Sequence, residues 1–146
     1  MNAEPSQYSY FLGVDVQVRR PCTFYVLDQD LGYVASGLLQ GEKWDDICNN
    51  LRSLVVSLQA QGMGSVAVGI DAPRRGLPAP RQWYWRKSTW VPRSSKERGY
   101  GRHCEVVIKA LGLGNPQWTR LAVDSPPWMA LGYCLFESLT DLPQVF

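Results

Sequence analysis

The chain has 146 residues, of which 45% are hydrophobic and 19% are charged; this composition excludes a disordered chain and is typical of one compact domain with an apolar core. No run of about eighteen apolar residues is present, which excludes a membrane-spanning helix, and the N-terminus lacks the basic and apolar regions of a secretory signal. We therefore expect one domain over residues 1–146, in the cytoplasm and without a membrane partner. The net charge is only +2, so its distribution matters more than its size.

Three strands come first along the chain. Strict alternation in YFLGVDVQV, residues 10–18, predicts a strand with Gly13 and Asp15 on the face opposite its apolar residues. CTFYVLD and YVASGLLQ follow on either side of the turn signal QDLG. Residues 9–39 are therefore predicted to form a three-stranded antiparallel meander.

The hydrophobic period then changes to that of a helix and back again. Apolar residues between Lys43 and Gln61 recur at helical spacing and stop at the glycines of QGMG, which predicts one long amphipathic helix. SVAVGIDA, residues 65–72, alternates once more and places Gly69 and Asp71 opposite its apolar face, as in the first strand.

A basic loop and two helices complete the predicted order. We expect the segment after Asp71 to be a long loop without regular structure, of the kind that often binds ligands. KERGYGRHCEVVIKALG, residues 96–112, and PPWMALGYCLFESL, residues 126–139, are predicted to be helices.

This order of elements predicts an α/β fold with a mixed sheet. A helix between the third and fourth strands favours a right-handed connection that returns the fourth strand parallel to the first. If these two strands are neighbours, Asp15 and Asp71 lie side by side near the carboxyl ends of parallel strands, where ligand sites in α/β sheets collect.

Two adjacent carboxylates predict a metal site. Their repulsion is relieved by a divalent cation, and oxygen ligands favour Mg²⁺ or Mn²⁺. Such a site can activate water and stabilise the leaving oxygen of a phosphodiester. The structural alternative is that Asp71 shapes a turn or caps the next element, and that Asp15 is a hydrogen-bonded group at a strand end.

The basic residues are concentrated in one segment. Nine of the fifteen Lys and Arg residues lie between Arg74 and Arg102, with Glu97 the only acid and with tryptophans and tyrosines interleaved. Lys and Arg neutralise phosphates and aromatic rings stack on exposed bases, which predicts DNA or RNA as the partner. Alternatively, the tryptophans pin a loop to the core while the arginines stay solvated. The residues predicted to contact nucleic acid are Arg74, Arg75, Arg81, Trp83, Trp85, Arg86, Lys87, Arg98, Arg102 and His103.

The cysteines and the single histidine argue against other site chemistries. Cys22, Cys48, Cys104 and Cys134 are far apart, without a C-x-x-C pair, and His103 is the only histidine. This spacing argues against a zinc site and against a disulfide framework. We therefore expect buried free thiols.

The segments GVDV, GIDAPRRGLP, WYWRK and GYGRHCEVVIKALGLGNPQW resemble the family of predicted ribonuclease H-like nucleases catalogued as a domain of unknown function, DUF429. The resemblance implies a ribonuclease H-like mixed sheet with flanking helices and a metal-dependent nuclease that hydrolyses phosphodiester bonds. It implies Asp15, Asp71 and Glu105 as the catalytic acids, with Asp15 and Asp71 as metal ligands and Arg102 and His103 beside them. Glu105 is explained equally well by an exposed helical ion pair, worth about 0.3 to 0.5 kcal/mol.

At the C-terminus, this sequence departs from the pattern of the family that it resembles. Members of the family continue past LPQVF with a strand that carries a further glutamate, whereas this sequence ends at Phe146. We therefore expect a fifth strand, a following helix and a final metal ligand to be missing.

Two other functions compete with a nuclease. The first is a catalytically inactive ribonuclease H-like binding module that uses residues 81–102 to hold nucleic acid or a protein. The second is an actin-like kinase, which the residues VQVRRP after Asp15 disfavour, because a phosphate-binding turn there would offer glycine or serine. An open sheet edge could also recruit a second copy of the chain as a homodimer.

Overall fold

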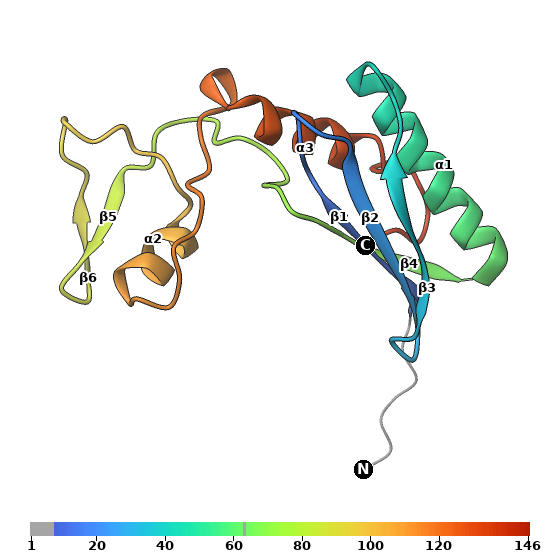
Figure 1. The fold of residues 1–146 in the computed structure, drawn as a ribbon. Coiled ribbons are helices and arrows are strands. Elements are labelled where there is room, and N and C mark those ends of the chain that lie inside the picture. Colours follow the sequence, from blue (N-terminus) through green and yellow to red (C-terminus); the bar gives the residue numbers. More distant parts are fainter. Residues whose placement is uncertain (1–7, 63) are drawn as a thin grey trace, which may run out of the picture. The chain divides into compact units, whose positions relative to one another are not determined.

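The computed structural model describes residues 8–62 and 64–146, and contacts divide the chain into two compact units (Figure 1). The sheet unit comprises the residues up to Arg74 together with Leu131–Phe146, and the inserted unit comprises Arg75–Ala130. The single domain expected from the sequence stays a prediction, because this division concerns contacts and not independent folding.

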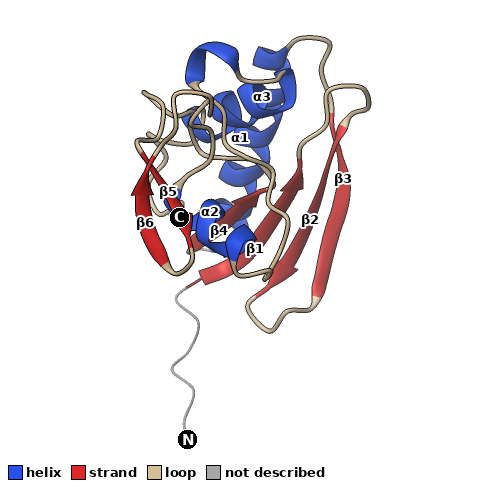
Figure 2. Cartoon of the chain, turned by 90° about the vertical axis from the view of Figure 1, so that its left-hand side faces the viewer, coloured by secondary structure: helices blue, strands red, loops and turns tan. Residues whose placement is uncertain are grey.

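The sheet unit contains a mixed four-stranded sheet, as predicted. Its strands are β1 (Tyr8–Asp15), β2 (Cys22–Asp28), β3 (Tyr33–Leu39) and β4 (Ser65–Ile70), and α1 (Trp44–Gly62) connects β3 to β4. The order across the sheet is β3-β2-β1-β4 (Figure 2), with β1 antiparallel to β2 and parallel to β4. The predicted return of the fourth strand beside the first is therefore confirmed.

Successive side chains of each strand point to opposite faces of the sheet, and those on one face pack into a shared core. α1 covers this face of the sheet in Figure 1, and the second half of α3 (Pro127–Glu137) adds to the same core. Each fully buried Leu or Val contributes about 1.5 to 3 kcal/mol through the hydrophobic effect. The completely or nearly completely buried residues are Leu12, Cys22, Val26, Leu39, Leu51, Val55, Val66, Leu131 and Leu135.

The two edges of the sheet differ. At one edge, β3 exposes Tyr33, Val34 and Leu38; the predicted homodimer through an open edge stays a prediction. At the other edge, Gln144–Phe146 run parallel to β4: the Val66 N–H donates to the Gln144 carbonyl at 3.0 Å, and the Val68 N–H donates to that of Phe146 at 2.7 Å. The last residues thus extend the sheet at the outer edge of β4.

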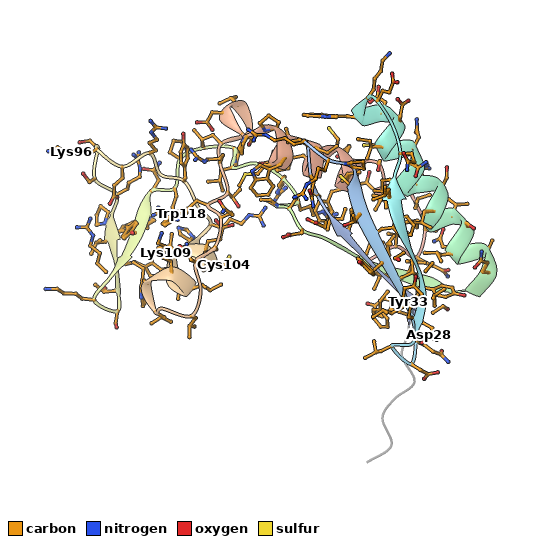
Figure 3. The ribbon with its side chains drawn as sticks, viewed as in Figure 1. Asp28, Tyr33, Lys96, Cys104, Lys109 and Trp118 are labelled. Carbon is orange, nitrogen blue, oxygen red and sulfur yellow. The ribbon has the colours of Figure 1, made fainter. Side chains whose placement is uncertain are left out.

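The turn between β2 and β3 is built on Asp28, which Figure 3 labels near Tyr33. One Asp28 carboxylate oxygen accepts the backbone N–H of Asp30 at 2.9 Å and of Gly32 at 2.7 Å. Such a carboxylate organises the turn signalled by QDLG in the sequence.

The inserted unit corrects two expectations. The predicted irregular loop contains a hairpin, β5 (Trp83–Arg86) and β6 (Thr89–Pro92). The helix predicted from Lys96 begins instead at His103 as α2 (His103–Ala110), before the short 3-10 helix η1 (Ala122–Asp124). Gly99 and Gly101 adopt positive φ angles of 73° and 85°, which a right-handed helix does not allow.

The expectation of buried thiols is half correct. Cys22 and Cys48 are buried, and burial raises the pKa of the Cys48 thiol to about 11. Cys104 and Cys134 are exposed. All four are free thiols. Within the described residues, no helix is long and apolar enough to cross a membrane.

The β5–β6 turn predicts a stabilising substitution. Lys87 and Ser88 form a two-residue connection with positive φ angles of 46° and 61°, the geometry for which Asn-Gly is preferred. Lys87→Asn with Ser88→Gly should raise the free energy of unfolding by about 1 kcal/mol, because Asn and Gly adopt positive φ angles with less strain than Lys and Ser. Urea denaturation measures the change.

A matched control separates turn geometry from a general effect of Asn and Gly. Ser95→Gly with Lys96→Asn makes the same chemical change nearby, where neither residue has a positive φ. This control should not stabilise the protein. Equal stabilisation by both double substitutions would contradict the role of the turn.

Candidate functional site

Asp15 and Asp71 lie next to each other on one face of the sheet. Asp15 ends β1 and Asp71 directly follows β4. The two strands pair Gly13 with Gly69, and the Asp71 N–H donates to the Val14 carbonyl at 2.9 Å. Neighbouring strands are about 4.8 Å apart, so the two aspartates stand one strand spacing apart, as the sequence predicted.

Both aspartates are exposed, and their carboxylates have few partners. Gln17 Nε2 donates to Asp15 Oδ2 at 2.6 Å, which orients that carboxylate. Within residues 8–62 and 64–146, the Asp71 carboxylate makes no hydrogen bond or ion pair. The structure therefore contradicts the alternative that the Asp71 side chain caps the next element.

The face of the sheet below the aspartates is open. A Cβ atom built on Gly13 or Gly69 would meet no atom within 4 Å. A cavity of about 520 Å³ lies on this face, lined by both glycines and by aromatic side chains that include Phe11, Tyr25 and Phe146. The paired glycines thus leave an apolar hollow on this face, and neither Asp15 nor Asp71 is part of its lining.

Helix α3 fixes the chain that follows Asp71. A side chain at Gly132 would collide with the Cβ atom of Ala72, so the helix backbone packs directly on this turn. The neighbouring Leu131 and Leu135 are buried in the core of the sheet unit. The position of Asp71 is therefore held both by β4 and by a helix anchored in the core.

The pair of aspartates fits a hard divalent cation. Mg²⁺ usually binds through one or two carboxylates and keeps the rest of its coordination for water and substrate phosphates, and this pair offers exposed oxygens beside open space. Among the described residues, no group of three His, Cys, Asp or Glu side chains lies close enough together to hold a metal.

Glu105 belongs to the inserted unit, where its carboxylate accepts three hydrogen bonds. The donors are the Arg102 N–H at 3.1 Å, the Thr119 N–H at 2.9 Å and the Thr119 hydroxyl at 2.5 Å. The first satisfies a free N–H at the start of α2. The helical ion pair offered as the alternative explanation of Glu105 is not formed with Lys109, four residues on; the Lys109 ammonium lies 5.4 Å from the Trp118 ring centroid.

Arg81, predicted to contact nucleic acid, is 8% exposed. Its guanidinium donates to three backbone carbonyls, those of Trp83, Tyr100 and Gly101. Its Cζ lies 5.0 Å from the Tyr84 ring centroid and 5.6 Å from that of Trp118. This arginine therefore joins several segments of the inserted unit.

Other predicted contact residues retain exposed groups. Trp83 is 49% exposed, and Arg74, Arg75, Lys87 and Arg98 are exposed as well. Arg74 belongs to the sheet unit, and the other four belong to the inserted unit.

The remaining predicted residues make contacts inside the inserted unit. Arg86 pairs with Glu97 at 3.1 Å, and Arg102 Nη2 donates to the Arg75 carbonyl at 3.0 Å. The exposed His103 packs edge-on against Trp90, with centroids 4.8 Å apart. Trp85 packs against Trp90 in the same way, at 5.0 Å.

Two residues that line a cavity in the inserted unit, Trp118 and Arg120, were not predicted from the sequence. Tyr84, Tyr100, Trp118 and Arg120 line a cavity of about 390 Å³ in the inserted unit. Trp118 and Arg120 lie outside the basic segment, in a stretch without helical or strand periodicity. The only sequence signal was a tryptophan and an arginine two residues apart in QWTR, which alone is weak.

No family model matches this chain, and neither does any curated protein or solved structure. The resemblance to the ribonuclease H-like nucleases therefore stays a prediction.

The hydrogen bonds of Glu105 predict a structural effect. Glu105→Gln removes one of the acceptor oxygens that hold Thr119 and the start of α2. It should lower the free energy of unfolding by about 1 to 3 kcal/mol, because buried donors lose a charged partner. Urea denaturation measures this loss, with Glu42→Gln at an exposed position as the control. Unchanged stability would argue against the structural role.

Proposed function

We propose that this protein is a metal-dependent nuclease, a hydrolase that cleaves phosphodiester bonds of DNA or RNA with a divalent cation, Mg²⁺ or Mn²⁺, held by Asp15 and Asp71. The observation that carries the proposal is the parallel register of β1 and β4, which sets the two exposed aspartates side by side. Ligand sites collect at this end of parallel strands.

The chain's own residues supply binding and orientation. Asp15 and Asp71 hold the cation, and Gln17 fixes the Asp15 carboxylate through its 2.6 Å hydrogen bond. The scissile phosphate would approach the cation from the solvent side, because both aspartates are exposed. A bound divalent cation would supply a Lewis acid and lower the pKa of its water.

The mixed sheet supports a ribonuclease H-like fold as the finer assignment. Three antiparallel strands are followed by a helical connection and by a fourth strand that is parallel to the first. The pairing of Gln144–Phe146 beside β4 extends this arrangement on the outer edge. The basic and aromatic residues of the inserted unit support nucleic acid as the substrate.

A binding module that lacks cleavage is the second candidate. It is favoured by Glu105, the third expected catalytic acid, whose carboxylate is engaged by Arg102 and Thr119 within the inserted unit. In this case the arginines and aromatic rings hold nucleic acid, and the aspartates contribute no chemistry.

Cleavage assays distinguish the two candidates. The full chain should cleave at least one of single-stranded DNA, duplex DNA, single-stranded RNA and an RNA–DNA hybrid when Mn²⁺ or Mg²⁺ is present, and none in EDTA. Asp71→Asn should reduce the rate about 100-fold or more, since even groups that only orient metal ligands change metal affinity about 10- to 100-fold.

Asp30→Asn is the matched control, because it makes the same change at an exposed position in the β2–β3 turn. It should leave the rate unchanged. Equal cleavage by Asp71→Asn and by the unmodified chain would contradict the proposal and indicate a contaminant. Binding without cleavage of any of these substrates would favour the binding module.

A further inference from the structure

The cavity of about 390 Å³ in the inserted unit has a cationic and aromatic lining. Three arginines, Arg81, Arg98 and Arg120, surround it together with the rings of Tyr84, Tyr100 and Trp118. It is separate from the cavity lined by Gly13 and Gly69, which belongs to the sheet unit.

Buried positive charge lies at the base of this cavity. Arg81 is nearly buried, and its guanidinium bonds to backbone carbonyls and not to a carboxylate. The lining has one acidic side chain, Glu97, which pairs through Oε1 with Arg86 at 3.1 Å and whose charge also acts on Arg81, against three arginines. The cavity therefore has an excess of positive charge that an anionic ligand would balance.

Two further arginines flank a fixed tyrosine. The Cζ atoms of Arg98 and Arg120 lie 5.9 Å and 4.5 Å from the Tyr100 ring centroid. The Tyr100 hydroxyl donates to Asp124 at 2.5 Å, which holds the ring in place. Within the described residues, neither arginine makes an ion pair with a carboxylate, so both retain donors for phosphate oxygens.

The other two rings are nearly parallel. Tyr84 and Trp118 have an interplanar angle of 12° and centroids 6.5 Å apart. Lys109 lies over the Trp118 ring, and the two residues are labelled close together in Figure 3. Flat aromatic side chains beside cationic groups are the combination that holds the bases and phosphates of single strands.

We propose that this cavity binds one nucleotide of a single-stranded nucleic acid. Arg98 and Arg120 hold its phosphate, and its base contacts the aromatic lining formed by Tyr84 and Trp118. A duplex fits this site poorly, because its bases are stacked on one another and their faces are covered. The inference rests on the proposed function only in taking nucleic acid as the substrate. It adds that this substrate is single-stranded.

Anisotropy of labelled oligonucleotides tests the proposal with the full chain in EDTA, where cleavage does not interfere. A single strand of about twelve nucleotides covers one site, and it should bind at least tenfold more tightly than its duplex. Arg98→Gln with Arg120→Gln should weaken single-strand binding tenfold or more. The slope of log K against log salt should fall by about 0.7, the contribution of the one single-strand phosphate that the two arginines hold.

Arg19→Gln with Arg20→Gln is the matched control, because it removes the same charge from exposed positions in the sheet unit. It should change binding less than threefold. An oligonucleotide of abasic sites has the phosphates without the bases and should bind about tenfold more weakly than the intact strand, as expected from the loss of stacking.

Four results would each overturn the inference: no binding of the single strand, equal binding of the duplex, equal binding of the abasic strand, or equal effects of the two double substitutions. Suppose that the single strand binds but that neither the unmodified chain nor any variant cleaves it with metal. This result would reject the nuclease but not the nucleotide site. Cleavage unaffected by the Arg98 and Arg120 substitutions, with unchanged binding, would reject this site alone.

Discussion

The parallel pairing of β1 with β4 is the constraint on which the sheet unit and its candidate site depend. It aligns Gly13 with Gly69, so that two positions without side chains lie next to each other on the open face. It also brings Asp15 beside Asp71, because the Asp71 N–H extends the ladder to the Val14 carbonyl. A register shift of one residue would turn one aspartate toward the core. The buried alternate residues therefore fix the geometry of the site as well as the stability of the sheet.

Arg81 has a comparable organising role in the inserted unit, through chemistry that is unusual for a core residue. A buried guanidinium is costly unless its donors are satisfied, and here three backbone carbonyls and two aromatic rings surround it. Desolvation by burial lowers the Arg81 pKa. The same arrangement leaves unbalanced positive charge beside Arg98 and Arg120 at the cavity. Packing and electrostatics in this unit thus have a common source.

The sequence predicted the sheet unit well because its signals are periodic and local. Alternation around Asp15 and Asp71 identified both strands, and the helix between them implied the parallel return. The structure of the inserted unit was predicted less well, because it depends on contacts that no local sequence pattern encodes. The β5–β6 turn uses Lys87 and Ser88 at positive φ where glycine or asparagine would have been recognisable. For Glu105, helical spacing offered an ion pair as the alternative to a catalytic role, whereas its carboxylate binds Thr119 fourteen residues away.

A calorimetric titration of the full chain with Mn²⁺, beside Asp15→Asn and Asp71→Asn, tests the central claim most directly. The claim is that two carboxylates, placed by parallel strands, share one divalent cation. We predict saturable binding by the unmodified chain and its loss in both variants, with circular dichroism verifying that all three are folded. Binding that persists in either variant, or no binding by the unmodified chain, would contradict a shared site.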